Sequence, residues 1–166
     1  MSIALSLFEQ AKKQFNTRQD VKEARAVIAK ITAIVDELGK NFVVMEGQEL
    51  QECQVKLSGY KFYLADIIAD LKNKARYIDV WIKDEKARLW PQMKEQIKEA
   101  GNKPTRDEIE NALLIQLGPQ IEEQTFFDAE HTATQLKSYA IDDMLTAIVQ
   151  RVAEKKREFE QVKNLT

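Results

Sequence analysis

The sequence has few of the residues from which catalytic and metal sites are built. It contains one cysteine, Cys53, and one histidine, His131, among 166 residues. A single cysteine excludes an internal disulfide framework and agrees with a reducing compartment. A lone histidine without an organised group of Cys, Asp or Glu predicts neither a zinc site nor a nucleophile–base pair. We therefore interpret Cys53 as a packing residue and His131 as a surface or interface residue, and we predict no metal and no cofactor.

Turn residues, long apolar runs and nucleotide-binding motifs are scarce or missing as well. Five glycines and three prolines are too few for a many-stranded β protein. There is no run of eighteen apolar residues and no signal-peptide pattern, so neither membrane spanning nor secretion is expected. The expected location is the cytoplasm, that of the host cell if a phage encodes the chain. Since the phosphate-loop, dinucleotide-binding and nucleophile-elbow motifs are also missing, we do not expect an enzyme.

The apolar residues recur with helical spacing along nearly the whole chain. Two seams step by alternating threes and fours: Val21, Ala24, Ile28, Ile31, Val35, Leu38, and then Leu50, Cys53, Leu57, Tyr60, Leu64, Ile67, Leu71. The second seam continues to Leu89 and Met93 with a looser step, so its register drifts. A third apolar stripe is predicted at Phe126, Ala129, Ala133, Leu136, Ala140, Met144, Ile148, Val152. These patterns predict an all-α fold.

Local signals divide this helical pattern into elements. In "GNKPTRDEIENAL", Gly101 suits the left-handed position after a helix, and Pro104 prevents simple continuation. Thr105 and Glu108 form a capping-box pattern, which predicts a corner at 101–105 and a short helix at 106–116. A long C-terminal helix should open near Pro119 and run to about residue 160. Pro91 is expected to kink or break the preceding helix near residues 87–90.

The expected architecture is a long antiparallel helical hairpin with coiled-coil character and short N-terminal helices. Residues 1–47 would form the accessory helices, the first a short amphipathic helix over the first sixteen residues with a Ser start. Residues 48–166 would form the hairpin, in one compact domain. A homo-oligomer is expected, because two long seams and additional aromatic faces exceed what one hairpin covers.

Charge is distributed unevenly, although the net charge is only −2. Residues 72–106 contain ten basic and five acidic residues, whereas residues 107–150 contain nine acidic residues and Lys137 as the single basic one. Such segregation favours either a face that meets a polyanion or, equally, chance clustering on solvated helix faces.

Basic and aromatic residues alternate in the first of these segments, as single-strand binding requires. The candidate phosphate contacts are Lys74, Arg76, Lys83, Lys86 and Arg88, extended at the turn by Lys103 and Arg106. The candidate stacking residues are Tyr77, Trp81 and Trp90. In the alternative interpretation the aromatics belong to the core or to a protomer interface and the cations are solvated. DNA and RNA are not distinguished, since both offer phosphates and stacking faces.

Over roughly residues 48–151 the chain resembles the UvsY-like recombination mediators of tailed phages. The resemblance consists of a long basic helix with "KARLW" near its end, the polar turn "GNKPTRDEIE" and a long helix that closes with "LTAIVQR". Lys86 and Arg88 match a Lys-Ala-Arg-Leu run associated with DNA contact. Leu145, Ala147, Ile148 and Arg151 match an L-x-A-I-x-x-R pattern.

This resemblance implies a helical hairpin that binds single-stranded DNA, forms oligomers and helps to load a RecA-type recombinase. A recombinase and a single-strand-binding protein would be its partners. The residues also allow a second hypothesis of another class. A protein–protein scaffold, or a phage-encoded inhibitor, would act through the coiled-coil seams and the acidic segment 107–150.

Overall fold

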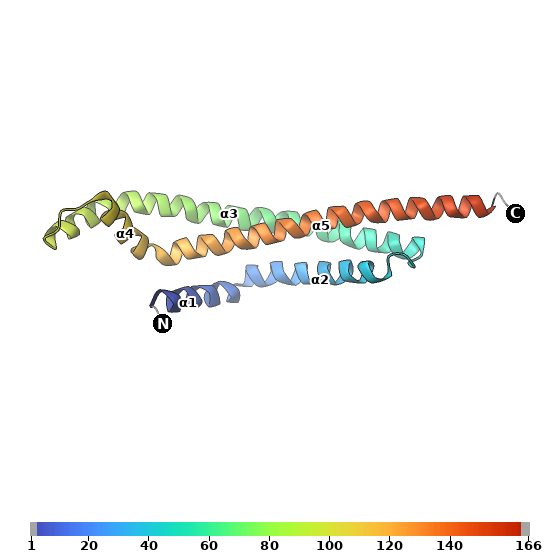
Figure 1. The fold of residues 1–166 in the computed structure, drawn as a ribbon, viewed down its shortest axis with the longest axis horizontal. Helices are drawn as coiled ribbons and strands as arrows, with labels where there is room; N and C mark the ends of the chain where they lie inside the picture. The colour runs from blue at the N-terminus through green and yellow to red at the C-terminus, as the bar shows by residue number, and fades with distance from the viewer. Residues whose placement is uncertain (1–2, 164–166) are drawn as a thin grey trace. The chain divides into compact units, whose positions relative to one another are not determined.

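The computed structural model describes the backbone of residues 3–163 and the side chains of Glu9 and of residues 11–163. This part of the chain contains five α-helices and no strand: α1 (Ile3–Thr17), α2 (Gln19–Asn41), α3 (Gly47–Glu99), α4 (Arg106–Gln116) and α5 (Gly118–Lys163). Figure 1 shows α3 and α5 running in opposite directions. The predicted all-α hairpin with N-terminal helices is therefore confirmed. The predicted Ser start of the first helix lies outside the described residues.

The helices pack in two units, each with its own core. The α2 unit consists of residues 19–69 and 132–163, and the α4 unit consists of residues 3–18 and 70–131. Because α3 and α5 each pass from one unit into the other, both units contain a segment of each long helix.

In the α2 unit, three helices bury residues that recur every seven positions. The buried residues of its main core cluster are Ile31 and Leu38 of α2, Leu50, Leu57 and Leu64 of α3, and Ile141 and Ile148 of α5. A step of seven places one side chain every two turns on the same helix face, which is the spacing of a coiled-coil seam. Each buried leucine or isoleucine contributes about 1.5–3 kcal/mol.

In the α4 unit, α4 closes over one end of α3. Buried residues Ile82, Leu89 and Met93 of α3 meet Ile109, Leu113 and Leu117. Ile109, Leu113 and the C-cap residue Leu117 are four apart, so they form one buried stripe along the inner face of α4. At the other end, Phe15 of α1 packs against the rings of Phe126 and Phe127 at centroid distances of 5.4 and 5.0 Å.

The buried seam of α3 changes register between Leu71 and Ala75. Leu50, Leu57, Leu64 and Leu71 are seven apart, and the seam resumes at Ala75, from which Ile82 and Leu89 again follow at steps of seven. The four-residue step from Leu71 to Ala75 is a stutter, which locally unwinds a left-handed supercoil. A second four-residue step leads from Leu89 to Met93, so the drift predicted from the sequence occurs at two places.

The predicted stripe of α5 is wrong in its N-terminal half. Ala129, Ala133 and Ala140 are exposed and Leu136 is 62% exposed, whereas Phe127, Thr134, Ile141 and Ile148 are buried. The helix is rotated because Phe127 and Ile141 bury more apolar area than alanines do, which offsets the inclusion of Thr134. The C-terminal part is correct, since Met144 and Val152 pack on the core beside Ile148.

The corner between α3 and α4 forms as its local chemistry predicts. Gly101 has φ of 82°, its N–H donates to the Lys98 carbonyl at 2.9 Å, and the Asn102 N–H donates to the Ile97 carbonyl at 3.2 Å. These are the two hydrogen bonds of a Schellman motif. Thr105 is the N-cap of α4, and its capping box with Glu108 is complete.

Pro91 does not break α3. The helix continues to Glu99, so of the two expected outcomes, a kink or a break near residues 87–90, the break is wrong. Pro91 is exposed and lies on the helix face opposite the buried seam. On that face water can hydrate the Ala87 carbonyl that loses its helical hydrogen bond, because Ala87 is exposed as well.

Candidate nucleic-acid interface

One flank of α3 in the α4 unit gathers basic side chains. Successive residues of an α-helix are rotated by about 100°, so each side chain can be placed relative to the buried seam. Five cations fall on the same flank, here called the basic track: Lys72, Arg76, Lys83, Lys86 and Lys94. The track spans about 33 Å at 1.5 Å per residue. Asp79 is the one acid on this flank of the helix.

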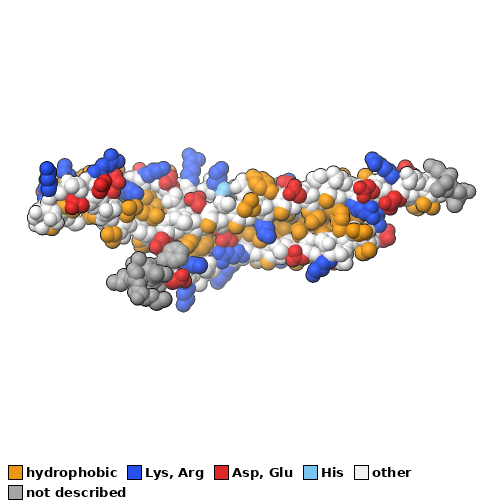
Figure 2. All heavy atoms as spheres, viewed as in Figure 1, with side chains coloured by type: hydrophobic (Ala, Val, Ile, Leu, Met, Phe, Trp, Pro, Cys, Tyr) orange, Lys and Arg blue, Asp and Glu red, His pale blue; other side chains and the backbone are white. Residues whose placement is uncertain are grey.

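Most cations of the basic track have no protein partner. Lys83 donates to Asp79 at 2.6 Å, but no ion pair of Lys72, Arg76, Lys86 or Lys94 is found among the described residues. Lys72, Arg76, Lys83 and Lys94 are exposed, and Lys86 is half-buried. Figure 2 shows Lys and Arg side chains spaced along α3 in this unit. These groups therefore remain available to an anion.

The two cations on the opposite flank of α3 are paired with acids. Lys74 binds Asp70 at 2.5 Å, and Arg88 binds Glu85 through two hydrogen bonds. The Glu85 carboxylate raises the pKa of Arg88, and the Arg88 hydrogen bonds lower the pKa of Glu85. Lys74 and Arg88 were predicted as phosphate contacts, and the structure places them away from Arg76, Lys83 and Lys86.

This separation follows from the two Lys-Ala-Arg runs. In each run the lysine and the arginine are two residues apart, and side chains at that spacing do not share a helix face. Lys74 and Arg76 therefore point to opposite flanks of α3, as do Lys86 and Arg88. The sequence prediction missed Lys72 and Lys94, which counting from the buried seam with the helical period would have identified.

The two remaining predicted cations lie at the corner. Lys103 is exposed in the turn between α3 and α4. Arg106 begins α4, and its Nε donates to Glu110 Oε1 at 2.9 Å, which raises the pKa of Arg106. Arg106 is thus partly neutralised, whereas no ion pair of Lys103 is found in the described part of the chain.

The three predicted stacking residues do not form one surface. Tyr77 is 73% exposed and Trp81 is 38% exposed, and both lie on the flank opposite the basic track. Trp90 lies on the track side of α3, is half-buried and packs beside the α4 core. Of the three, Trp90 is therefore the ring that shares a flank with the unpaired cations.

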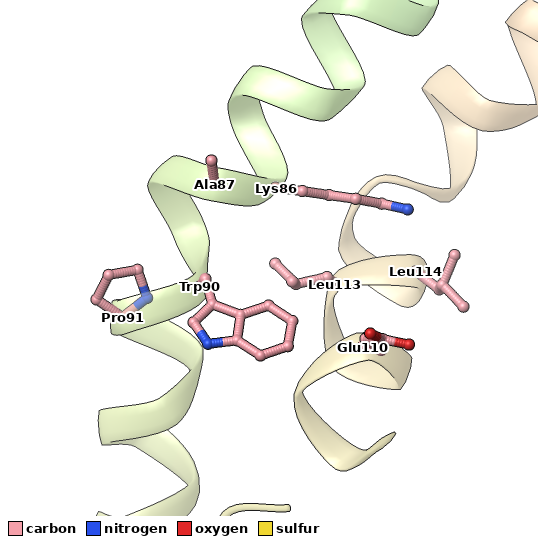
Figure 3. A pocket seen from close by; sticks show the side chains of 7 residues that line it. All are labelled: Lys86, Ala87, Trp90, Pro91, Glu110, Leu113 and Leu114. Atoms are coloured by element: carbon pink, nitrogen blue, oxygen red, sulfur yellow. The ribbon is translucent and has the colours of Figure 1, made fainter. Parts of the chain in front are cut away.

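Trp90 also lines a cleft between α3 and α4. The cleft has a volume of about 450 Å³ and is lined by Lys86, Ala87, Trp90, Pro91, Glu110, Leu113 and Leu114. Figure 3 shows the indole ring between the two helices, with Leu113 facing it and the Lys86 side chain reaching towards α4. Its walls are mainly apolar, and its charged groups are an ammonium and a carboxylate.

No group of three His, Cys, Asp or Glu side chains is placed to hold a metal ion within residues 3–163. Burial raises the pKa of the Cys53 thiol, which packs against the core of the α2 unit. No helix of this part of the chain has the length and apolarity that a membrane span requires.

Comparison with known proteins does not identify a relative of this chain. Protein-family models, curated proteins and solved structures give no match to this chain. The basic track and the neighbouring cleft are therefore the features on which a functional assignment rests.

Proposed function

We propose that this chain is a non-enzymatic single-stranded DNA-binding protein whose basic track holds the phosphate backbone. One observation carries the proposal: five cations lie on one flank of α3 with one acid among them, and for four of them no ion pair is found among the described residues. A row of unpaired cations along a helix attracts a linear polyanion and releases its counterions on binding. Since the net charge of the chain is −2, this attraction is local to the track.

The proposal favours a single strand over a duplex because one aromatic ring accompanies the cations. Trp90 lies on the flank of the track, and an aromatic ring next to phosphate contacts can stack on an unpaired base. In a duplex the bases are already stacked on each other and offer no free face to such a ring.

The UvsY-like resemblance extends the proposal to a role. A helical hairpin that holds a single strand along one arm would present it to a RecA-type recombinase and displace a strand-coating protein. The observed hairpin of α3 and α5 agrees with the architecture that the resemblance implies. The recombinase, the single-strand-binding protein and a cytoplasmic location in a phage-infected host are parts of this proposal.

A second candidate is a protein–protein scaffold, favoured by apolar residues left on the surface of the α2 unit. Phe62 and Tyr63 of α3 are 79% and 67% exposed, and Leu136 and Tyr139 of α5 are more than half exposed. Exposed aromatic side chains of this size are typical of interaction surfaces. They suit a homo-oligomer or a protein partner, and neither excludes DNA binding by the α4 unit.

The experiment compares charge reversal on the two flanks of the same helix. Arg76→Glu/Lys83→Glu alters the basic track, and Lys74→Glu/Arg88→Glu makes the same change in charge on the opposite flank. Affinity for a fluorescent 15-nucleotide strand is measured by anisotropy at low salt. We expect the track variant to bind at least tenfold more weakly than the control variant, because only the track is aligned with the phosphates.

Two results would overturn the proposal. Equal losses of affinity in both variants would mean that strand binding depends on the total charge of the protein and not on the basic track. Negligible affinity of the unaltered protein at low salt would remove nucleic-acid binding altogether and leave the scaffold as the better candidate. Circular dichroism of each variant verifies that the helices are intact.

A further inference from the structure

The cleft between α3 and α4 adjoins the basic track. Lys86 belongs both to the track and to the lining of the cleft, and Trp90 lies one turn further along the same flank. Lys83 precedes the cleft and Lys94 follows it along the helix. A strand that follows the track therefore passes the mouth of the cleft.

The size and lining of the cleft suit a flat aromatic group. Its volume of about 450 Å³ falls within the range of small-molecule sites, about 300–1,000 Å³. Trp90 supplies an aromatic surface, and Leu113 and Leu114 supply apolar walls from α4. Leu114 is 46% exposed and Ala87 and Pro91 are exposed, so the cleft opens to solvent.

We propose that this cleft receives one unstacked nucleobase of the strand whose phosphates lie on the basic track. The inference rests on the proposed function and adds a base-binding subsite to it. The base packs against the indole of Trp90 and between the leucines of α4, while Lys86 binds the adjoining phosphate. Stacking of an unpaired base on a protein aromatic ring is the usual source of base-dependent affinity in single-strand binding.

Glu110 adds a preference among the bases. Its Oε1 accepts from Arg106 at 2.9 Å, and no hydrogen bond to its Oε2 is found among the described residues. A carboxylate oxygen accepts from the exocyclic amino group of cytosine or adenine, whereas the corresponding edge of thymine presents a carbonyl oxygen. The cleft therefore prefers an amino-bearing base to thymine.

The test uses three strands with the same number of phosphates: fifteen deoxycytidines, fifteen thymidines and fifteen abasic units. The chain has two tryptophans, so Trp81→Phe leaves Trp90 as the single one. The tryptophan fluorescence of this variant then reports on the cleft. We expect the cytidine strand to bind about tenfold more tightly than the abasic strand and to protect Trp90 from acrylamide quenching. The thymidine strand should bind with intermediate affinity.

Two further variants locate the effect in the cleft. Ala87→Phe, at an exposed position of the lining, fills the cleft and should remove the difference between cytidine and abasic strands. Ala65→Phe, at an exposed alanine of α3 in the α2 unit, is the matched control and should retain it. Glu110→Gln should reduce the preference for cytidine over thymidine and leave the affinity for thymidine unchanged.

The outcomes separate this inference from the proposed function. Equal affinity for the cytidine and abasic strands would overturn the base-binding cleft and leave phosphate binding by the track intact. A cytidine preference that survives Ala87→Phe would also overturn it, because the base would then bind elsewhere. If none of the three strands bound at low salt, the proposed function would fail and this inference with it.

Discussion

Thr105 and Glu108 show how two side chains define the start of a helix. The Glu108 carboxylate accepts from the Thr105 N–H at 3.0 Å and from its hydroxyl at 2.9 Å, while the Thr105 hydroxyl accepts from the Glu108 N–H at 3.3 Å. The first two bonds lower the pKa of Glu108, because they favour the ionised carboxylate. The start of α4 is therefore sensitive to protonation.

We predict that the capping box loses its contribution to stability in acid. Because the pKa of Glu108 is lower in the folded state, its contribution is present above the unfolded pKa, near 4.3, and is lost as pH falls through the folded value. At pH 7 Glu108→Gln should have a lower thermal midpoint than the unaltered chain, and at pH 3 the two midpoints should converge. Thermal unfolding followed by circular dichroism measures both midpoints. A difference between the two midpoints that is the same at pH 3 as at pH 7 would contradict the prediction.

At the scale of the element, α3 tolerates two features that usually interrupt a helix. Its seam takes a four-residue stutter at Leu71–Ala75, and Pro91 lies within its last three turns. Each is accommodated by packing, because buried residues resume at steps of seven after the stutter and Pro91 faces solvent. Contacts from α4 to Leu89 and Met93 hold α3 helical on both sides of the proline.

We predict that Pro91→Ala stabilises the protein. The substitution restores a donor for the Ala87 carbonyl and removes the ring clash, and proline in a helix interior is about 3 kcal/mol less favourable than alanine. Since the observed helix already accommodates the proline, we expect a gain of about 1–3 kcal/mol in the free energy of unfolding. Urea denaturation measures this free energy. A variant less stable than the unaltered protein would contradict the prediction and would mean that the proline helps to position α3 for packing against α4.

At the scale of the whole molecule, the basic track and the exposed side chains proposed for protein contact belong to different units. The basic track belongs to the α4 unit, and the exposed Phe62, Tyr63, Leu136 and Tyr139 belong to the α2 unit. In the proposed function, strand binding would therefore use other residues than self-association or partner binding. A protein with these two surfaces can hold a strand with one unit and a protein with the other.

We predict a salt dependence that reflects the length of the track. Five phosphate contacts on a single strand give a slope of roughly −3 to −4 in a plot of log affinity against log salt concentration. Arg76→Glu/Lys83→Glu should make this slope shallower by at least one unit, whereas Lys74→Glu/Arg88→Glu should leave it nearly unchanged. Anisotropy titrations between 50 and 200 mM salt, roughly the range over which such slopes are resolved, provide the measurement.

Much of the fold could be predicted because its signals act over short distances. The corner at 101–105 and the helix at 106–116 depend on Gly101, Thr105 and Glu108, whose hydrogen bonds reach no further than five residues. The seam through Leu50, Leu57 and Leu64 could be predicted equally well, because a leucine occupies each of these positions seven residues apart. In both cases local chemistry and packing favour the same structure.

The candidate site was predicted less well, because basic and aromatic residues were grouped by type and not by the helix face on which they lie. Lys74 and Arg88 were grouped with Arg76 although they lie on the other flank, and Lys72 and Lys94 were left out. The cleft next to Trp90 could not be predicted at all, since it exists only where α4 packs against α3. Its residues come from two segments about twenty positions apart in the sequence.

By itself, the sequence determined the helices, their caps and the corner that turns α3 into α4. Those features follow from the spacing of apolar residues and from hydrogen bonds between near neighbours. Only the tertiary structure decided which face of α5 is buried, whether α3 passes Pro91, and where the cleft beside Trp90 lies. Each of these depends on how much apolar area a partner helix can cover, and a local pattern does not contain that quantity.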